Sequence, residues 1–234
     1  MCFNSMNHFH FRAALCAVTA VIFLSVFSAC TPELTIQAAG TDQAVLSFSA
    51  GFSKEMEKTF RSMMSALSAD STAGSSEDSP IFNANDITAL MQSAGVRNVK
   101  TNTGRNGAVS ASGVLRPVSQ STLAQTGMLS EDAHSLTLTF GITQFQKLYA
   151  LLDEEAQAYF DLLMIPALNE EKMTPAEYNE TLASMYGKPF ADEITNGTLT
   201  IALVSPDGKK KVSAKTTLGE LLTLTKDKSW SVQF

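Results

Sequence analysis

The stretch LTIALVSPDGKKKV, residues 199–212, contains the signals that decide the fold class. Its residues Leu199, Ile201 and Leu203 alternate with polar or small neighbours, which is typical of a β-strand with one buried face. Ser-Pro-Asp-Gly at 205–208 is a turn sequence, and Val212 begins a second strand-like run. The stretch therefore predicts two strands joined by a hairpin turn.

Helical patterns come before this hairpin. Thr174-Pro175-Ala176-Glu177 is a capping box with proline at the first helical position, and Gly187 is a stop signal. Asn85 is suited to cap a shorter helix that ends at Gly95. Apolar residues at helical spacing form three further stripes, in residues 52–67, 145–152 and 156–164. The sequence therefore predicts helices interspersed with strands.

Further strands are predicted on both sides of these helices. Val96–Thr103 and Ala108–Leu115 flank Gly104-Arg105-Asn106-Gly107, and Asn-Gly between two strand-like runs indicates a hairpin. Residues 136–140 alternate apolar and polar, as do residues 230–234 at the C-terminus. We expect an α+β fold, an antiparallel sheet with helices on one face.

A single α+β domain is expected in residues 43–234. The order strand, helix, helix, strand, turn, strand occurs in residues 43–118 and again in residues 135–218, where DITALMQSAG and EYNETLASMYG occupy equivalent places. Two interpretations stay open at this point. One is a duplicated β-α-α-β-β unit, and the other is a chance recurrence of an order common in α+β proteins.

The first 29 residues have the three parts of an export signal. A polar stretch ends at Arg12, an uncharged apolar run covers residues 13–27, and small residues Ser28 and Ala29 follow. The sequence Phe27-Ser28-Ala29-Cys30 resembles the lipobox of bacterial lipoproteins, in the looser form of spirochaete-type boxes, with Phe where the family usually has Leu. The resemblance implies a signal peptide over residues 1–29, cleavage between Ala29 and Cys30, diacylglycerol on the Cys30 sulfur and acylation of the new amine.

Two alternatives to lipidation remain. The first is an uncleaved anchor, although residues 13–29 number 17, at the short limit for a membrane-spanning helix. The second is ordinary secretion. Under the lipoprotein interpretation, residues 30–42 are an acylated N-terminus and tether, with a short edge strand as the alternative. The same resemblance, with Thr31 after the cysteine, implies the outer membrane of the cell envelope rather than the inner membrane.

Charge and cysteine content narrow the function classes. Arg12 is the one charged side chain in residues 1–29, so residues 30–234 carry 16 basic and 23 acidic residues, net −7. This charge argues against nucleic acid as a partner. Cys2 and Cys16 lie in the leader, so the processed chain keeps Cys30 alone and forms no internal disulfide.

Candidate catalytic groups are few. His134 is the one histidine after the leader, and no G-x-S-x-G motif accompanies it. The acidic clusters at 153–155 and 170–171 precede predicted helices, where the helix dipole favours carboxylates. Lys209-Lys210-Lys211 is expected at a solvated hairpin tip. The sequence therefore predicts no catalytic residue, no cofactor and no metal site.

We expect a membrane-anchored envelope lipoprotein with a non-enzymatic binding or structural role, not an enzyme. Its expected partners are the membrane, through the acyl chains, and an envelope protein or a hydrophobic ligand. A first alternative is a carrier of lipid or another apolar ligand, because methionines gather on predicted helix faces. A second is an envelope hydrolase that uses paired carboxylates. Its candidate residues are Glu154, Glu155, Glu170 and Glu171.

Overall fold

A computed structural model describes residues 30–51, 84–103, 108–152, 163–169 and 171–234, together with residues 53, 54, 58, 59, 62, 157, 160 and 161. The predicted leader, the 104–107 turn and most of the apolar stripe in residues 52–67 lie outside the described residues. Helices and strands are mixed along the chain, so the predicted α+β class is confirmed.

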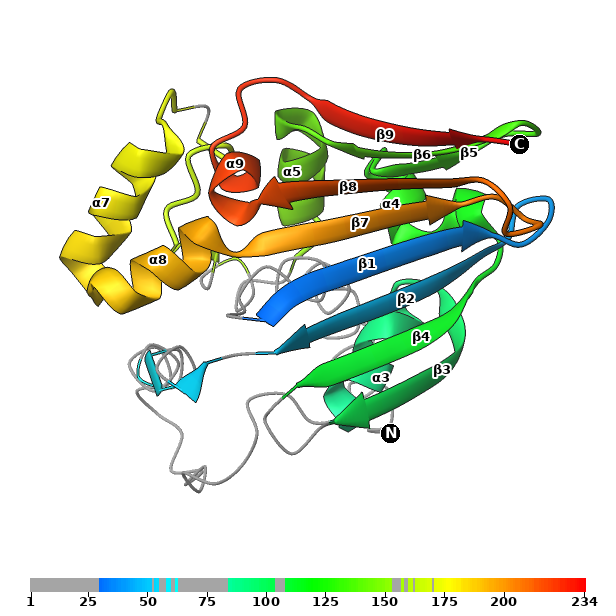
Figure 1. Cartoon of the computed structure of the whole chain (residues 1–234), viewed down its shortest axis with the longest axis horizontal. Coiled ribbons are helices and arrows are strands. Elements are labelled where there is room, and N and C mark those ends of the chain that lie inside the picture. Colours follow the sequence, from blue (N-terminus) through cyan, green and yellow to red (C-terminus); the bar gives the residue numbers. More distant parts are fainter. Residues whose placement is uncertain are drawn as a thin grey trace, which may run out of the picture.

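The main sheet has six strands (Figure 1). Across the sheet they are β3 (Val96–Thr103), β4 (Val109–Leu115), β2 (Ala44–Gly51), β1 (Cys30–Ala38), β7 (Thr198–Val204) and β8 (Lys211–Thr217). Four of the five neighbouring pairs are antiparallel, and β1 pairs with β7 in parallel. The expectation of an antiparallel sheet is therefore wrong at this one pair. Strands that pair in parallel need a long crossover, and here the whole middle of the chain supplies it.

Strand β1 lies inside the sheet, between β2 and β7. Residues 30–38 are therefore neither a tether nor an edge strand, which corrects both expectations for this segment. Leu34, Ile36 and Ala38 are buried, while Thr35 and Gln37 between them are half-buried. The weak alternation in this stretch is that of an inner strand with one face against the core.

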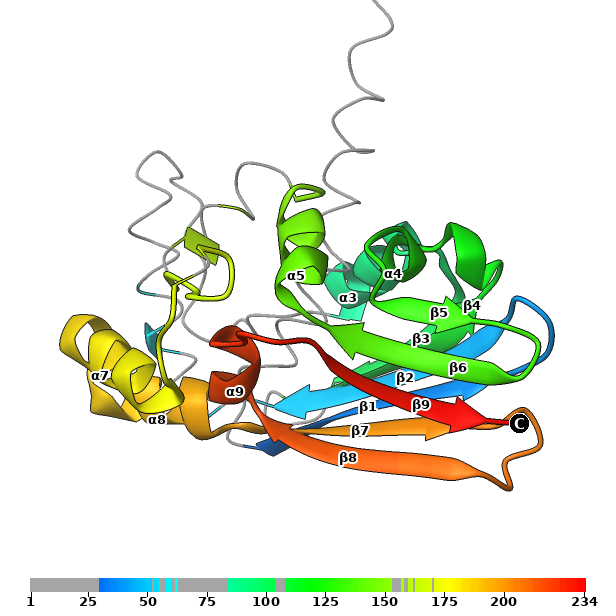
Figure 2. The same ribbon diagram turned by 90° about the horizontal axis from the view of Figure 1, so that it is seen from above.

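A second, three-stranded sheet packs over the main one (Figure 2). Its strands are β5 (Leu129–Glu131), β6 (Ser135–Phe140) and β9 (Lys228–Gln233), with β6 in the middle. Leu136 lies opposite Val232 and Leu138 opposite Trp230 in the β6–β9 register. Leu136, Leu138 and Val232 belong to the same apolar core as the buried residues of the main sheet, and partly buried Trp230 packs against that core.

Helices α3 (Ala84–Ser93), α4 (Thr122–Gln125) and α5 (Ile142–Tyr149) lie on the same side of the main sheet as the second sheet (Figure 2). This agrees with the expectation of helices on one face. Helices α7 (Pro175–Tyr186) and α8 (Lys188–Asn196) lie at the end of the sheet where β1 begins, and short α9 (Leu218–Leu222) follows β8 (Figure 1). A 3-10 turn covers Val118–Gln120.

Local signals for α7 and for two hairpins are confirmed, whereas Asn85, expected as a cap, lies inside α3. Thr174 caps α7: its hydroxyl accepts from the Glu177 N–H at 3.3 Å, and the Glu177 carboxylate accepts from the Thr174 N–H at 2.8 Å. The helix ends at Gly187, whose φ is 88°. The β3–β4 and β7–β8 hairpins are antiparallel, as predicted.

The proposed duplication is not present. In residues 43–118 the first strand, β2, pairs with the last, β4. In residues 135–218 the first strand, β6, lies in the second sheet, while the last, β8, is an edge strand of the main sheet next to β7. The two halves therefore share an order of elements along the chain but not an order of strands in space.

Within the described part of the chain, no helix is both long enough and apolar enough to cross a bilayer.

Candidate functional site: the open face of the main sheet

The helices and the second sheet cover one face of the main sheet, and no described element covers the other (Figure 2). We call this other face the open face. Along β1, β2 and β4 its side chains alternate with buried ones, whereas the alternate residues of β8 are mostly half-buried and Ala202 of β7 is itself buried. The strand register aligns the open-face residues in rows across the sheet. The open-face residues are Arg97, Lys100 and Asn102 on β3; Ser110, Ser112 and Val114 on β4; Val45, Ser47 and Ser49 on β2; Glu33, Thr35 and Gln37 on β1; Thr200, Ala202 and Val204 on β7; and Lys211, Ser213 and Lys215 on β8.

Small hydroxyl side chains occupy the middle of the open face. Ser110 lies opposite Ser49, and Ser112 lies opposite Ser47. Ser47 is in turn opposite Thr35 on β1. Serine is not among the residues enriched in strands, where β-branched and aromatic side chains fit the pleated surface better. Because the four serine side chains are short, this part of the sheet surface lies below its surroundings, and their hydroxyls make it rich in hydrogen-bonding groups.

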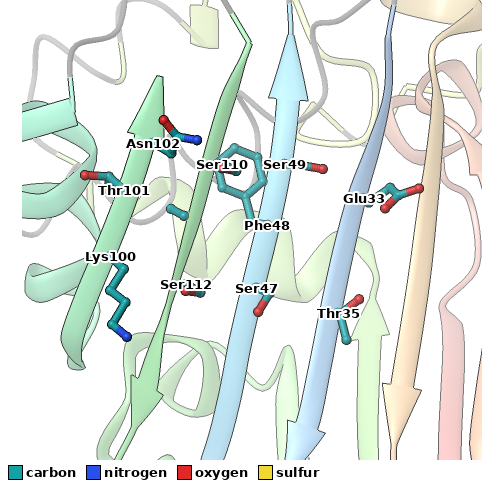
Figure 3. A pocket seen from close by; sticks show the side chains of 11 residues that line it. Glu33, Thr35, Ser47, Phe48, Ser49, Lys100, Thr101, Asn102, Ser110 and Ser112 are labelled. Carbon is teal, nitrogen blue, oxygen red and sulfur yellow. The ribbon is translucent and has the colours of Figure 1, made fainter. Parts of the chain in front are cut away.

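These serines form the floor of a hollow of about 370 Å³. Figure 3 shows them between two walls of longer side chains. Lys100 and Asn102 of β3 form one wall, and Glu33 and Thr35 of β1 form the other. The hollow therefore has hydroxyls below, an ammonium group on one side and a carboxylate on the other.

Positive charge lies at both edges of the open face. Arg97 and Lys100 are on edge strand β3, Lys211 and Lys215 are on edge strand β8, and all four are exposed. The strands β3 and β8 are five inter-strand spacings apart, about 24 Å. Glu33 is the one acidic residue of the open face, and no ion pair within the described residues involves any of these five groups. Lysines on edge strands also discourage edge-to-edge aggregation, which is a structural reason for part of this pattern.

A second hollow, of about 340 Å³, lies beside α5. Phe160, Met164 and Leu168 give it an apolar part, while Tyr149 donates a hydrogen bond of 2.8 Å to the Asp161 carboxylate at its rim. This bond and burial raise the pKa of Tyr149. Part of the surrounding chain, residues 153–156 and 158–159, lies outside the described residues.

The carboxyl group of Glu131 lies on the face of the second sheet that packs against the core. Glu131 is opposite Leu136 in the β5–β6 register, on the inner side of the second sheet. Burial, and then repulsion from Asp42, raise the pKa of Glu131. Asp42 has the opposite shift, because hydrogen bonds from the Ser119 N–H at 2.7 Å and from its hydroxyl at 2.8 Å lower the pKa of Asp42. An inward carboxyl on a short edge strand has a structural role of its own in blocking edge pairing.

Among the described residues, those singled out in the sequence do not lie together in one site. Cys30 is the first residue of β1, whereas Ala29 lies outside the described residues. His134 is exposed in the β5–β6 turn, and Lys209 at the β7–β8 tip lies 3.8 Å from Asp207. Glu171 is exposed, while Glu154, Glu155 and Glu170 lie outside the described residues.

The methionines of the predicted helix faces that the structure describes share no common site, whereas Met56, Met63 and Met64 lie outside the described residues. Met91 is buried in the core and Met185 is exposed. Met164 lines the second hollow. Among the described residues no cluster of three or more His, Cys, Asp or Glu could hold a metal ion.

Sequence reasoning missed the open face. The signal was present, because serines occupy alternate positions in SFSAG of β2 and in VSASGVL of β4. Those positions alternate with buried ones such as Phe48 and Ala111. The sequence does not say, however, which strands become neighbours, so the serines could not be placed in one cluster.

Comparisons of the chain with protein-family models, with curated proteins and with solved structures found no match. No relative therefore assigns a role to any residue. The open face combines hydroxyl groups, which both donate and accept hydrogen bonds, with exposed cations that have room for a partner. Such a surface is suited to binding a polar, negatively charged molecule.

Proposed function

We propose that this protein is a bacterial envelope lipoprotein, anchored by acyl chains on Cys30, that has a non-enzymatic role in binding through the open face of its main sheet. The observation that carries the binding role is the open face itself, with serine hydroxyls in the middle and basic residues along both edge strands. The anchor is supported by the lipobox-like sequence before Cys30, and Thr31 favours the outer membrane.

The position of Cys30 gives the anchor a structural consequence. Cys30 begins β1 and lies opposite Gly51 of β2. Two residues after Gly51, the N–H and the hydroxyl of Ser53 donate to the carboxylate of Glu193 in α8, the N–H at 3.1 Å. Acyl chains on Cys30 would therefore hold the folded domain against the bilayer with no linker between them, and the strands would run away from the membrane surface.

Binding fits the open face better than catalysis does. Glu33 is its one carboxylate, so the face has no second acid to share proton transfer with. Its serines lie beside other hydroxyls rather than beside a histidine, the usual base that activates a serine nucleophile. The face supplies hydrogen bonds and positive charge over a wide, flat area.

Incorporation of radiolabelled palmitate tests the anchor. Wild type should be labelled, and Cys30→Ala should lose the label and accumulate as the unprocessed precursor. Cys16→Ala is the matched control, because it removes a leader cysteine outside the lipobox-like sequence and should leave labelling unchanged. Equal labelling of wild type and Cys30→Ala would contradict the proposal.

The second hollow favours one alternative, a carrier of an apolar ligand. Its volume of about 340 Å³ lies at the lower end of the range for small-molecule sites, and Phe160, Met164 and Leu168 line it. A carrier should retain lipid beyond the Cys30 acyl chains when the native protein is purified and analysed by mass spectrometry. Met164→Lys should then abolish retention, whereas Met185→Lys, on exposed surface, should not.

A further inference from the structure

The geometry points to an anionic polysaccharide as the ligand of the open face, with sugar units in the hollow between β1 and β3 and negatively charged groups against the basic side chains of β3 and β8. This inference rests on the proposed binding role of that face.

The charge of the open face differs in sign from that of the whole chain. The chain as a whole has a net charge of −6, yet the open face carries four cations and one carboxylate. The acidic residues are therefore concentrated elsewhere, and the open face carries a net positive charge. Complementary charge chiefly sets the rate and the specificity of association, so the favoured partner is negatively charged.

The spacing of the cations favours a polymer over a small anion. Arg97 and Lys100 on β3 are about 24 Å from Lys211 and Lys215 on β8, measured across the strands. A single phosphate or carboxylate can contact one edge only. A chain that crosses the sheet can contact both edges and pass over the hollow between them.

The floor of the hollow favours sugars as the units of that chain. The Ser47, Ser49, Ser110 and Ser112 hydroxyls can each donate one hydrogen bond and accept others, which matches the hydroxyl groups of a polyol. Phe48 of β2 also lines the hollow, but it is buried, and the open-face residues include no aromatic side chain on which a nucleic acid base could stack. A hollow of about 370 Å³ is also in the range of small-molecule sites.

The position of Cys30 separates this ligand from lipid headgroups. Because β1 begins at Cys30 and runs away from it, an anchored domain presents the end of the sheet to the bilayer and the open face to the side. Headgroups of the anchoring membrane would meet α7 and α8, which lie at that end (Figure 1). The open face is left to polymers of the envelope.

Binding of fluorescently labelled dextran sulfate to the full chain in a non-ionic detergent tests the inference. Uncharged dextran controls for the sugar without charge, and polyglutamate controls for charge without sugar. We expect binding to dextran sulfate that weakens as salt is added, and at least about tenfold weaker binding to the other two polymers. Equal affinity for polyglutamate would overturn the polysaccharide in favour of an acidic polypeptide, and no binding to any of the three would overturn the inference.

Variants locate the binding surface. Lys100→Glu combined with Lys215→Glu should lower the affinity for dextran sulfate about tenfold, because one charge is reversed at each edge. Lys226→Glu combined with Lys147→Glu is the matched control, since both lysines are exposed and off the open face. A similar loss in the control pair would show nonspecific attraction and contradict the inference.

The hollow has its own test. Ser112→Leu fills it and should lower the affinity for dextran sulfate several-fold, whereas Ser213→Leu lies on the open face outside the hollow and should change the affinity less than about twofold. Circular dichroism of each variant checks that the fold is kept. Equal effects of both variants would remove the hollow from the proposal. Palmitate labelling is independent of these measurements. A negative result with dextran sulfate would therefore contradict the proposed ligand without contradicting the proposed Cys30 anchor.

Discussion

Cys30 lies directly opposite Gly51 in the antiparallel pair of β1 and β2, at the end of the sheet where α7 and α8 also lie. The residue proposed to carry the lipid is therefore part of an inner strand. The proposed anchor at this point would fix which end of the domain meets the bilayer, and the nine residues of β1 extend about 30 Å away from it.

Fluorescence quenching should reveal this orientation. Met185, whose side chain is 52% exposed, is near the α7–α8 junction at the Cys30 end, and Lys209 is at the β7–β8 tip at the opposite end. In protein reconstituted into vesicles with spin-labelled lipids, a fluorophore on Met185→Cys should be quenched several-fold more than one on Lys209→Cys, because the two ends are about 30 Å apart. Equal quenching would rule out the fixed orientation.

The Glu131 carboxyl should make stability depend on pH. Its Oε2 atom is buried without a hydrogen-bond partner, and burial followed by repulsion from Asp42 raises its pKa. The charged form is therefore less stable in the fold than in the unfolded chain, so ionisation costs stability at neutral pH. The cost disappears as the pH falls below the ordinary value of 4.5.

Glu131→Gln should consequently raise the free energy of unfolding at neutral pH by about 0.5 kcal/mol, a modest figure because the group is partly solvated. Urea denaturation at several pH values measures it, and the gain should vanish in acid. Asp132→Asn is the control of opposite sign. Hydrogen bonds from the His134 N–H and the Ser135 hydroxyl lower the pKa of Asp132, so that variant should lose stability at neutral pH. A gain in both variants would contradict the assignment.

Tyr178 should stabilise the fold through one buried hydrogen bond. Its side chain is 0% exposed, its O–H donates to the Leu163 carbonyl at 2.8 Å, and burial raises the pKa of Tyr178 so that it stays protonated. Tyr178→Phe leaves that carbonyl unpaired and should cost about 1–2 kcal/mol in urea denaturation. Tyr149→Phe, which removes an exposed bond to Asp161, should cost about 0.5 kcal/mol or less. Equal costs would contradict this explanation.

Gly113 should tolerate no side chain. A Cβ atom there would lie 2.4 Å from the Val96 Cγ1 and 2.9 Å from the Arg97 carbonyl oxygen, at the irregularity where β3 pairs with β4. Gly113→Ala should therefore lower the urea midpoint, at a cost of about 1–3 kcal/mol. Ser112→Ala, on the open face one residue earlier, should change stability by less than about 0.5 kcal/mol. An unaffected midpoint in Gly113→Ala would show that β3 moves aside freely.

Elements with local signals were predictable from the sequence. The capping box at Thr174 and Glu177 marks the start of α7, and Gly187 marks its end, because both signals act through hydrogen bonds and dihedral angles of adjacent residues. Asn-Gly at 106–107 predicted the β3–β4 pair, because the dihedral angles that these two residues favour are those of a hairpin turn. Burial of alternate residues in β6 also follows directly from the strand period.

Arrangements that depend on distant partners were not predictable. The duplication failed because two similar orders of elements fold into different strand orders. The 30–42 segment was predicted as a tether or an edge strand, because nothing within it indicates that β2 and β7 will flank residues 30–38. The serines of the open face belong to separate hairpins, so their proximity exists only in the folded sheet.

The sequence by itself determined the α+β class, the main hairpins, the limits of α7 and the lipobox-like context of Cys30, since each depends on the conformational preferences or chemistry of a few consecutive residues. Only the tertiary structure decided that β1 lies inside a mixed sheet and that Ser47, Ser112 and Lys100 face solvent together. Pairing between distant strands is selected by burial of their apolar faces against one shared core, and that selection involves the whole chain at once.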